Sequence, residues 1–250
     1  MTIPTYLPYF VFAATAATVI AVLYGLNRSL AEAKWQAADR TRTFRVSAVI
    51  LLGWLALDIA LSAMGAYHVT FGDIPTIQYG ILLPILVGAL LIWRSETARR
   101  IIGAAPQQWL VGVQLYRALG VIFLILYVTG KLPGQFAWPA GVGDIAIGLS
   151  APFVGLAYAR SPRKATGLVA AWNAFGILDL IVAVGTGFMT APSRFLFLDV
   201  QPTSELITVL PMVLIPVYLV PLSIVLHLAS LAKLRREAAE GHGRIAGARA

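Results

Sequence analysis

Four ionisable residues lie within long apolar stretches of the sequence: Asp58, Arg117, Asp144 and Asp179. A charged side chain at membrane depth is costly unless it is paired or hydrated, so such residues often mark functional sites. If all four ionise, two negative charges are in surplus, and we expect one Asp to be ionised beside Arg117 and at least one other to be neutral. A carboxyl that changes its protonation at this depth suits a proton-coupled carrier. The alternative is a structural Arg–Asp pair that fixes the helix register.

Helical spacing indicates how these residues are positioned. With a rise of 1.5 Å per residue, Asp58, Arg117 and Asp179 fall near the middle of their apolar stretches, so either Asp58 or Asp179 is a plausible partner for Arg117. Small residues recur every three or four positions on the faces that carry Asp144 and Asp179, and such stripes let helices approach closely. We therefore expect a small polar cavity. Its predicted solute or proton path is lined by Asp58, Gln114, Arg117, Asp144, Asn173 and Asp179, with Tyr116 beside them.

Two of the three histidines are candidate contacts for a cofactor. His68 lies at one end of the second apolar stretch and His227 near the opposite membrane face, so they are not expected to bind one haem together. Each remains a candidate for a cofactor held with another partner. The ordinary alternative for His227 is a polar side chain at the membrane interface. The sequence predicts no metal site, and it leaves the cofactor unknown.

The elements that must position these residues are membrane-spanning helices. Only 12% of the residues are charged, against about a quarter in a soluble domain, and the mean hydropathy is +0.80. The first ten residues carry no Lys or Arg, so we expect the first apolar stretch to be a retained span. The sequence predicts an all-α integral membrane protein, a seven-helix bundle over residues 1–230 followed by a basic tail over 231–250. The predicted spans are 6–26, 46–67, 76–94, 107–129, 139–159, 166–187 and 205–230.

Basic residues are concentrated in alternate loops. Five Lys or Arg residues lie in 27–45, three in 94–106, three in 160–165 and five in the tail. The opposite loops hold only Lys131 and Arg194. By the positive-inside rule we expect the N-terminus outside and the C-terminus in the cytoplasm. The net charge of +8 then reflects topology, and no nucleic-acid partner is expected.

Two paired features suggest an internal repeat. Asp58 and Asp179 both follow a leucine in the middle of a span, and Pro84 and Pro216 each lie in the span that comes next. This pattern suggests a 3+1+3 parallel repeat, with the fourth span as the linker. Parallel repeats about an axis normal to the membrane are a known transporter architecture.

Several short motifs carry a resemblance to a known group of proteins. They include Gln114–Gly120, Gly143–Asp144, Trp172–Asn173, Leu178–Leu180 and the proline-rich stretch from Ile215 to His227. Together with shorter matches between residues 132 and 152, they resemble a family of bacterial seven-span inner-membrane proteins. The resemblance covers about the last 145 residues. It implies a bacterial inner-membrane location and carries no assigned activity.

Two better-known seven-span groups resemble the chain in topology alone. Microbial rhodopsins also combine an Arg with aspartates, but residues 205–230 contain no lysine for a retinal Schiff base, so covalent retinal is not expected. SWEET sugar carriers share the 3+1+3 arrangement, but their paired Pro-Gln motifs lack a convincing counterpart here.

The sequence has no phosphate-binding loop, zinc-type spacing or nucleophile elbow, and its function is more consistent with a non-enzyme. We expect a small-solute or proton-coupled carrier in the lipid bilayer, with the proline-broken seventh span as a moving part. Alternatives are a bundle that binds a lipid, quinone, pigment or haem, and a structural subunit of a membrane complex. An integral-membrane enzyme is a weaker option. The substrate, the ligand and the oligomeric state are open.

Overall fold

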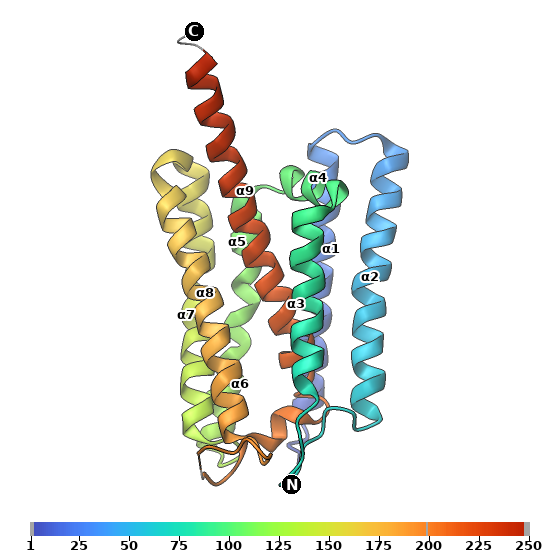
Figure 1. Ribbon diagram of the computed structural model, residues 1–250, viewed down its shortest axis with the longest axis vertical. Coiled ribbons are helices and arrows are strands. Elements are labelled where there is room, and N and C mark those ends of the chain that lie inside the picture. Colours follow the sequence, from blue (N-terminus) through green and yellow to red (C-terminus); the bar gives the residue numbers. More distant parts are fainter. Residues whose placement is uncertain (1–2, 199, 248–250) are drawn as a thin grey trace.

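The computed structural model describes residues 3–198 and 200–247. Within these ranges the chain is helical and has no strand, and seven helices are long and apolar enough to cross a membrane, which confirms the predicted seven-helix architecture (Figure 1). The direction of insertion and the internal repeat remain predictions. The seven spans are α1 (Leu7–Glu32), α2 (Ala37–Ala63), α3 (Ile77–Arg94), a composite fourth span (Gln107–Val128), α7 (Gly134–Arg160), α8 (Pro162–Thr190) and a composite seventh span (Ile215–Ala239).

The fourth span changes its helical type at mid-depth. It begins as α5 (Gln107–Gly112), continues as the 3₁₀ segment η1 (Val113–Gly120), and ends as α6 (Val121–Val128). A 3₁₀ stretch inside a longer helix often marks a hinge or a strained sequence. The segment η1 carries Arg117, so the most costly charge in the chain lies on an irregular part of its helix.

The seventh span is also irregular. The predicted span began at residue 205, but residues 204–208 form the short 3₁₀ turn η2 (Ser204–Thr208), and the spanning helix begins at Ile215. It starts with the π-helical turn η3 (Ile215–Leu219) and continues as α9 (Val220–Gly247). Proline removes a backbone donor and crowds the preceding turn, which accounts for the break around Pro211 and Pro216.

The small-residue stripe of α7 packs against the fourth span, as the spacing predicted. A Cβ placed on Gly148 would lie 2.2 Å from the backbone nitrogen of Ala118, and one on Gly155 would lie 2.9 Å from the carbonyl oxygen of Gln108. Two helices can approach this closely only where one of them lacks side chains. The fourth span, α7 and α8 therefore form a tight group that holds Arg117.

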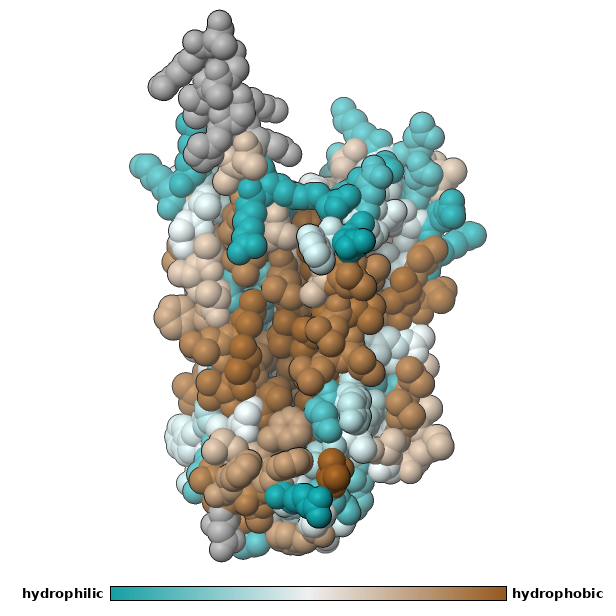
Figure 2. All heavy atoms as spheres, in the orientation of Figure 1, coloured by the Kyte–Doolittle hydropathy of each residue, from teal (hydrophilic) through white to brown (hydrophobic). Residues whose placement is uncertain are grey.

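The helices α2 and α3 bury far less of their surface. Asp58 is the only buried residue that α2 contributes, and α3 contributes only Ile77, Gly80 and Ile81. Some of their other apolar side chains, such as Trp54 and Ile85, are half-buried against the core, and many of the rest are exposed. A wide apolar band crosses the face of the bundle shown in Figure 2. Such a band matches the hydrocarbon core of a bilayer.

The two ends of the bundle differ in charge. We call the end that bears the N-terminus the N-terminal end; the linkers 64–76, 129–133 and 191–214 lie there (Figure 1). The opposite end, which we call the basic end, holds the turn 33–36, the amphipathic helix α4 (Glu96–Ala104) and the last turns of α9. Hydrophilic side chains collect at the basic end in Figure 2.

Candidate functional site: a buried arginine centre

Arg117 is the hub of the site, with only 2% of its side chain exposed. Its Nε donates to Oδ1 of Asp144 at 2.7 Å, and one Nη2 hydrogen goes to Oδ2 of Asp179. Its Nη1 donates both to the carbonyl oxygen of Gly176 and to Nε2 of His227, each at 3.1 Å. The guanidinium offers five N–H groups in a fixed fork, and four of these are used here. We call Arg117, Asp144, Asp179 and His227 the arginine centre.

The hydrogen bonds determine the tautomer of His227. A guanidinium can only donate, so Nε2 of His227 must be the bare, accepting nitrogen. Its Nδ1 then carries the proton and donates to Oδ1 of Asn173 at 2.8 Å. The amide nitrogen of Asn173 donates to the carbonyl oxygen of Val169 at 2.7 Å, which fixes the orientation of that amide. The ring of His227 is therefore held on both sides in a neutral form.

The network extends from the arginine centre toward the basic end. The amide nitrogens of Asn173 and Gln107 both donate to Oγ of Ser230, at 2.8 and 2.6 Å. About two turns farther along the same two spans, Gln114 and Ser223 exchange hydrogen bonds, with Oγ of Ser223 donating to Oε1 of Gln114 at 2.6 Å. These buried side chains tie the fourth span and α8 to α9, and they leave that side of the centre densely filled.

Three glycines make room for the centre. A Cβ on Gly143 would lie 1.6 Å from Oδ1 of Asp179, and one on Gly120 would lie 2.4 Å from Cβ of Asp144. A Cβ on Gly176 would lie 2.4 Å from Cε1 of His227. Any larger residue at these positions would occupy the space that the charged side chains now fill. The glycines are thus as much a part of the site as the ionisable residues.

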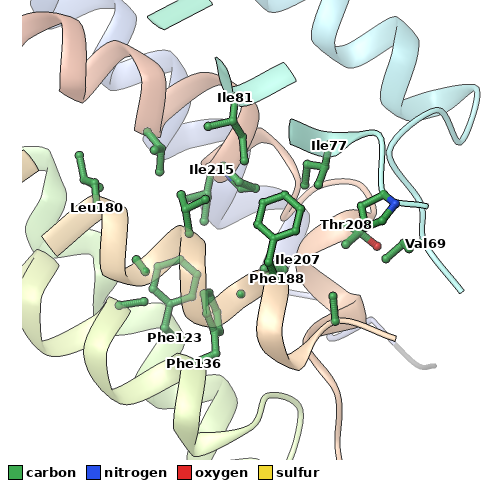
Figure 3. A pocket seen from close by; sticks show the side chains of 18 of the residues that line it. Val69, Ile77, Ile81, Phe123, Phe136, Leu180, Phe188, Ile207, Thr208 and Ile215 are labelled. Atoms are coloured by element: carbon green, nitrogen blue, oxygen red, sulfur yellow. The ribbon is translucent and has the colours of Figure 1, made fainter. Parts of the chain in front are cut away.

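A largely apolar cavity reaches the centre from the N-terminal end. Its volume is about 50 Å³, and among the described residues its polar lining side chains are Asp144 and Thr208. Figure 3 shows Phe123 and Phe136 on one side of it and Ile77 on another. Ligand pockets are mostly apolar with a few placed polar groups, and the lining of this cavity has that character. We call this space the main cavity.

A second cavity meets the main cavity at the arginine centre. Its volume is about 40 Å³, and it runs toward α1, where Phe10, Val11 and Ala14 line it. Arg117 and Tyr116 belong to its lining. The two cavities share five lining residues: Phe123, Asp144, Leu180, Ile215 and Val220. Asp144 is the only charged residue common to both linings.

The linkers at the N-terminal end cover the main cavity. Val69 and Pro75 precede α3, and Thr208 belongs to η2; all three line the cavity and are buried. The backbone nitrogen of Arg194 donates to the carbonyl oxygen of Asp73 at 2.9 Å, which joins the two linkers. Hydrogen bonds from the backbone and hydroxyl of Thr70 lower the pKa of the Asp73 carboxyl, so this turn stays charged at neutral pH.

The structure brings together five of the predicted path residues and leaves one apart. Asp144, Asp179 and Asn173 join Arg117 directly or through His227, and Gln114 lies one turn away on the same span. Asp58 does not reach this group. It is buried on α2, where the hydroxyl of Tyr67 donates to its Oδ1 at 3.2 Å, and its Oδ2 has no hydrogen-bond partner among the described residues.

The two candidate histidines occupy different surroundings. The interface alternative for His227 is wrong, because the side chain is fully buried beside Arg117. The sequence placed it too close to the membrane face because α9 continues well past residue 230. His68 lies at the N-terminal end, where its Nε2 is 3.0 Å from Oε1 of Glu205. No group of three or more metal-ligating side chains occurs in the described part of the chain.

The seventh span contains a lysine that the predicted range lacked. The predicted range 205–230 has no lysine, but the spanning helix includes Lys233. Its Nζ donates to the carbonyl oxygen of Gly103 on α4, at 2.9 Å, and pairs with Glu237. Lys233 therefore serves the packing of the basic end and lies away from the arginine centre.

Sequence reasoning missed Ser223, Ser230, Gln107, Gly143 and Gly176 as parts of the site. Serines and glycines are frequent in membrane helices, so their type alone gave no signal. The spacing of polar residues does provide a signal. Ser223, His227 and Ser230 follow one another at intervals of four and three residues, which places them on one face of α9. That face, once aligned with Arg117, would have indicated a polar strip.

Comparison with protein families finds one match. Residues 74–235 match the family described as a domain of unknown function (DUF8737). The matched segment is more than half of the chain; it contains the whole arginine centre with Asn173 and Ser230, whereas Asp58 and His68 precede it. Comparison with curated proteins and with solved structures finds no similar chain. The chain belongs to the family of this domain of unknown function.

Proposed function

We propose that this membrane protein is a proton-coupled carrier for small solutes, with the main cavity as the solute site and the arginine centre as the proton site. The observation that carries the proposal is the position of Asp144. This side chain pairs with Arg117 at 2.7 Å and also lines both cavities. A solute in either cavity would therefore contact the group that balances the buried charge.

The charge of the arginine centre supports proton coupling. Because His227 is held neutral, two carboxylates face one guanidinium, and full ionisation would leave one surplus negative charge. An unbalanced charge in a low-dielectric interior is strongly unfavourable, so the empty centre is expected to hold one proton. A solute that alters the pairing of Asp144 would alter the affinity for that proton, which is the linkage that coupling requires.

The irregular helices support a moving role. The cavities end between η1 and η3, the two segments where spanning helices depart from α-helical geometry. Alternating access needs flexible hinges near the solute site, and interrupted helices provide such hinges in known carriers. On the expected topology, the linkers at the N-terminal end cover the main cavity on the outside. The hydrogen-bonded side chains between the arginine centre and the basic end close the path on the inside. Asp58 lines neither cavity and stays out of this proposal.

Proton flux in proteoliposomes tests the proposal. Protein reconstituted with an internal pH dye is given a panel of solutes under an imposed pH gradient. We expect a solute-dependent proton movement that Asp144→Asn or Asp179→Asn abolishes, because each change removes a carboxyl of the proton site. Absence of flux with every solute and no proton leak would contradict a carrier. Asp58→Asn separates two paths: flux should persist if the path runs through the arginine centre and fail if Asp58 belongs to it.

A second candidate function is ligand binding without transport, as in a receptor or cofactor-binding bundle. The apolar lining of the main cavity favours it, because a lipid or quinone would fit such a surface. This alternative expects a bound molecule that co-purifies with the protein and no flux. An absorption spectrum of the purified protein from about 300 to 700 nm separates coloured cofactors from colourless ligands.

A further inference from the structure

The lining of the main cavity favours a ligand whose larger part is apolar. Its walls are formed by aromatic and branched side chains from α3, α6, α7 and α8, among them Ile81, Phe136 and Phe188 (Figure 3). Thr208 lies at the N-terminal end of the lining and Asp144 at the other. A sugar or another solute with many hydroxyl groups would leave those groups unpaired against this surface, at a cost for each of them.

One carboxylate oxygen is left free at the inner end of the cavity. Arg117 takes Oδ1 of Asp144, while Oδ2 has no hydrogen-bond partner among the described residues. The Asp144 side chain is 13% exposed, against 2% for Arg117. The group that a ligand meets at this end is therefore an acceptor with negative charge.

The guanidinium of Arg117 already has hydrogen-bond partners within the protein. Four N–H groups of Arg117 are engaged by Asp144, Asp179, Gly176 and His227. An anionic ligand would have to displace one of these partners and would add to a centre that already has a surplus of carboxylates. A positively charged donor would instead restore neutrality and pair with Oδ2 of Asp144.

We infer that the solute of this site is an amphiphilic amine: an apolar body in the main cavity and a protonated amino group against Oδ2 of Asp144. This inference rests on the proposed function and names its substrate class. Protonated amine and proton compete for the same surplus charge, so each amine that binds releases the proton that the empty centre holds. The charged and titratable groups near Asp144 are Arg117, Asp179, Tyr116 of η1 and, beyond the guanidinium, His227.

Three ligands of equal chain length test the head group. Octylamine, octanol and octanoate are titrated calorimetrically into the full-length protein in nanodiscs, and empty nanodiscs are subtracted to remove partitioning. We expect octylamine to bind at least about tenfold more tightly than octanol, because a charge-assisted hydrogen bond is roughly twice as strong as a neutral one, with octanoate weakest. Octanoate binding as tightly as octylamine, or no protein-dependent binding of any of the three, would overturn the inference.

Two variants place the preference at Asp144. Asp144→Asn keeps the shape of the side chain and is expected to bring octylamine to the affinity of octanol, whereas the loop variant Asp73→Asn is expected to keep the full preference. A preference for octylamine that survives in folded Asp144→Asn would contradict the assignment of the head group. If Asp144→Asn does not fold, the ligand series on the unchanged protein decides the question. Flux with octanoate would refute the amine as substrate class but would agree with a carrier function. Tight octylamine binding without flux would support the amine as ligand and contradict the carrier function.

Discussion

Replacing Arg117 with methionine is expected to destabilise the protein by about 3–5 kcal/mol, the range found when one partner of a buried ion pair is removed. Methionine fills a similar volume but leaves Asp144 and Asp179 without their cation and the carbonyl oxygen of Gly176 without its donor. Equilibrium unfolding in mixed micelles with increasing denaturing detergent would measure the loss. Arg117→Lys should also be destabilised, because an ammonium lacks the planar fork that reaches four partners.

A charge-neutral variant is the matched control for this prediction. Combining Arg117→Met with Asp144→Asn and Asp179→Asn removes the unpaired carboxylates, so most of the lost stability should return. The neutral variant should nevertheless show no proton flux, because it removes both carboxyl groups of the proposed proton site. Equal instability of the single and triple variants would mean that the cost comes from packing rather than from charge.

Gly176→Ala is expected to destabilise the protein by about 1–3 kcal/mol, the usual cost of overpacking a filled interior. The new Cβ would lie 2.4 Å from Cε1 and 2.5 Å from Nε2 of His227, and 3.2 Å from Nη1 of Arg117. The ring cannot move aside freely, because Asn173 and Arg117 hold its two nitrogens. We therefore expect lost stability together with reduced flux.

The control for this variant lies on the same helix. Gly185 also belongs to α8, but nothing lies within 4 Å of a Cβ built on it. Gly185→Ala should be neutral or stabilise the helix by up to about 1 kcal/mol, since alanine is the better helix former. Thermal unfolding in one detergent compares the two. Similar melting temperatures for both variants would contradict the claim that glycine is needed to accommodate His227.

The apolar lengths and the charged residues inside them were sufficient to predict the seven helices and three members of the arginine centre. A span needs about 20 apolar residues whatever its neighbours are, so hydropathy locates it directly. Arg117, Asp144 and Asp179 were identified because a charge in a membrane helix must find a partner. The glycine stripe of α7 likewise pointed to a close helix contact, and Gly148 against Ala118 confirms it.

The choice of partners and the cavities depend on how the helices face one another, and no single helix encodes this. Asp58 and Asp179 were equivalent candidates for pairing with Arg117, but only Asp179 is on a helix packed in the tight group. The placement of His227 failed because the span boundary was set too early. The apolar character of the main cavity arises where side chains from many separate segments meet, which the prediction of a small polar cavity did not anticipate.

The sidedness of the main cavity is the most direct test of the whole account. The chain has no cysteine, so Ala183→Cys in the cavity lining introduces a single thiol, and Ala170→Cys on the same helix lies outside both cavity linings. A small, membrane-impermeant cationic thiol reagent is applied to vesicles from either side. We expect the reagent to modify Ala183→Cys when it is applied from the side of the N-terminal end. Applied from that side, it should leave Ala170→Cys unmodified. Modification of Ala183→Cys only from the basic end, or from neither side, would contradict a solute path that reaches the arginine centre from the N-terminal end.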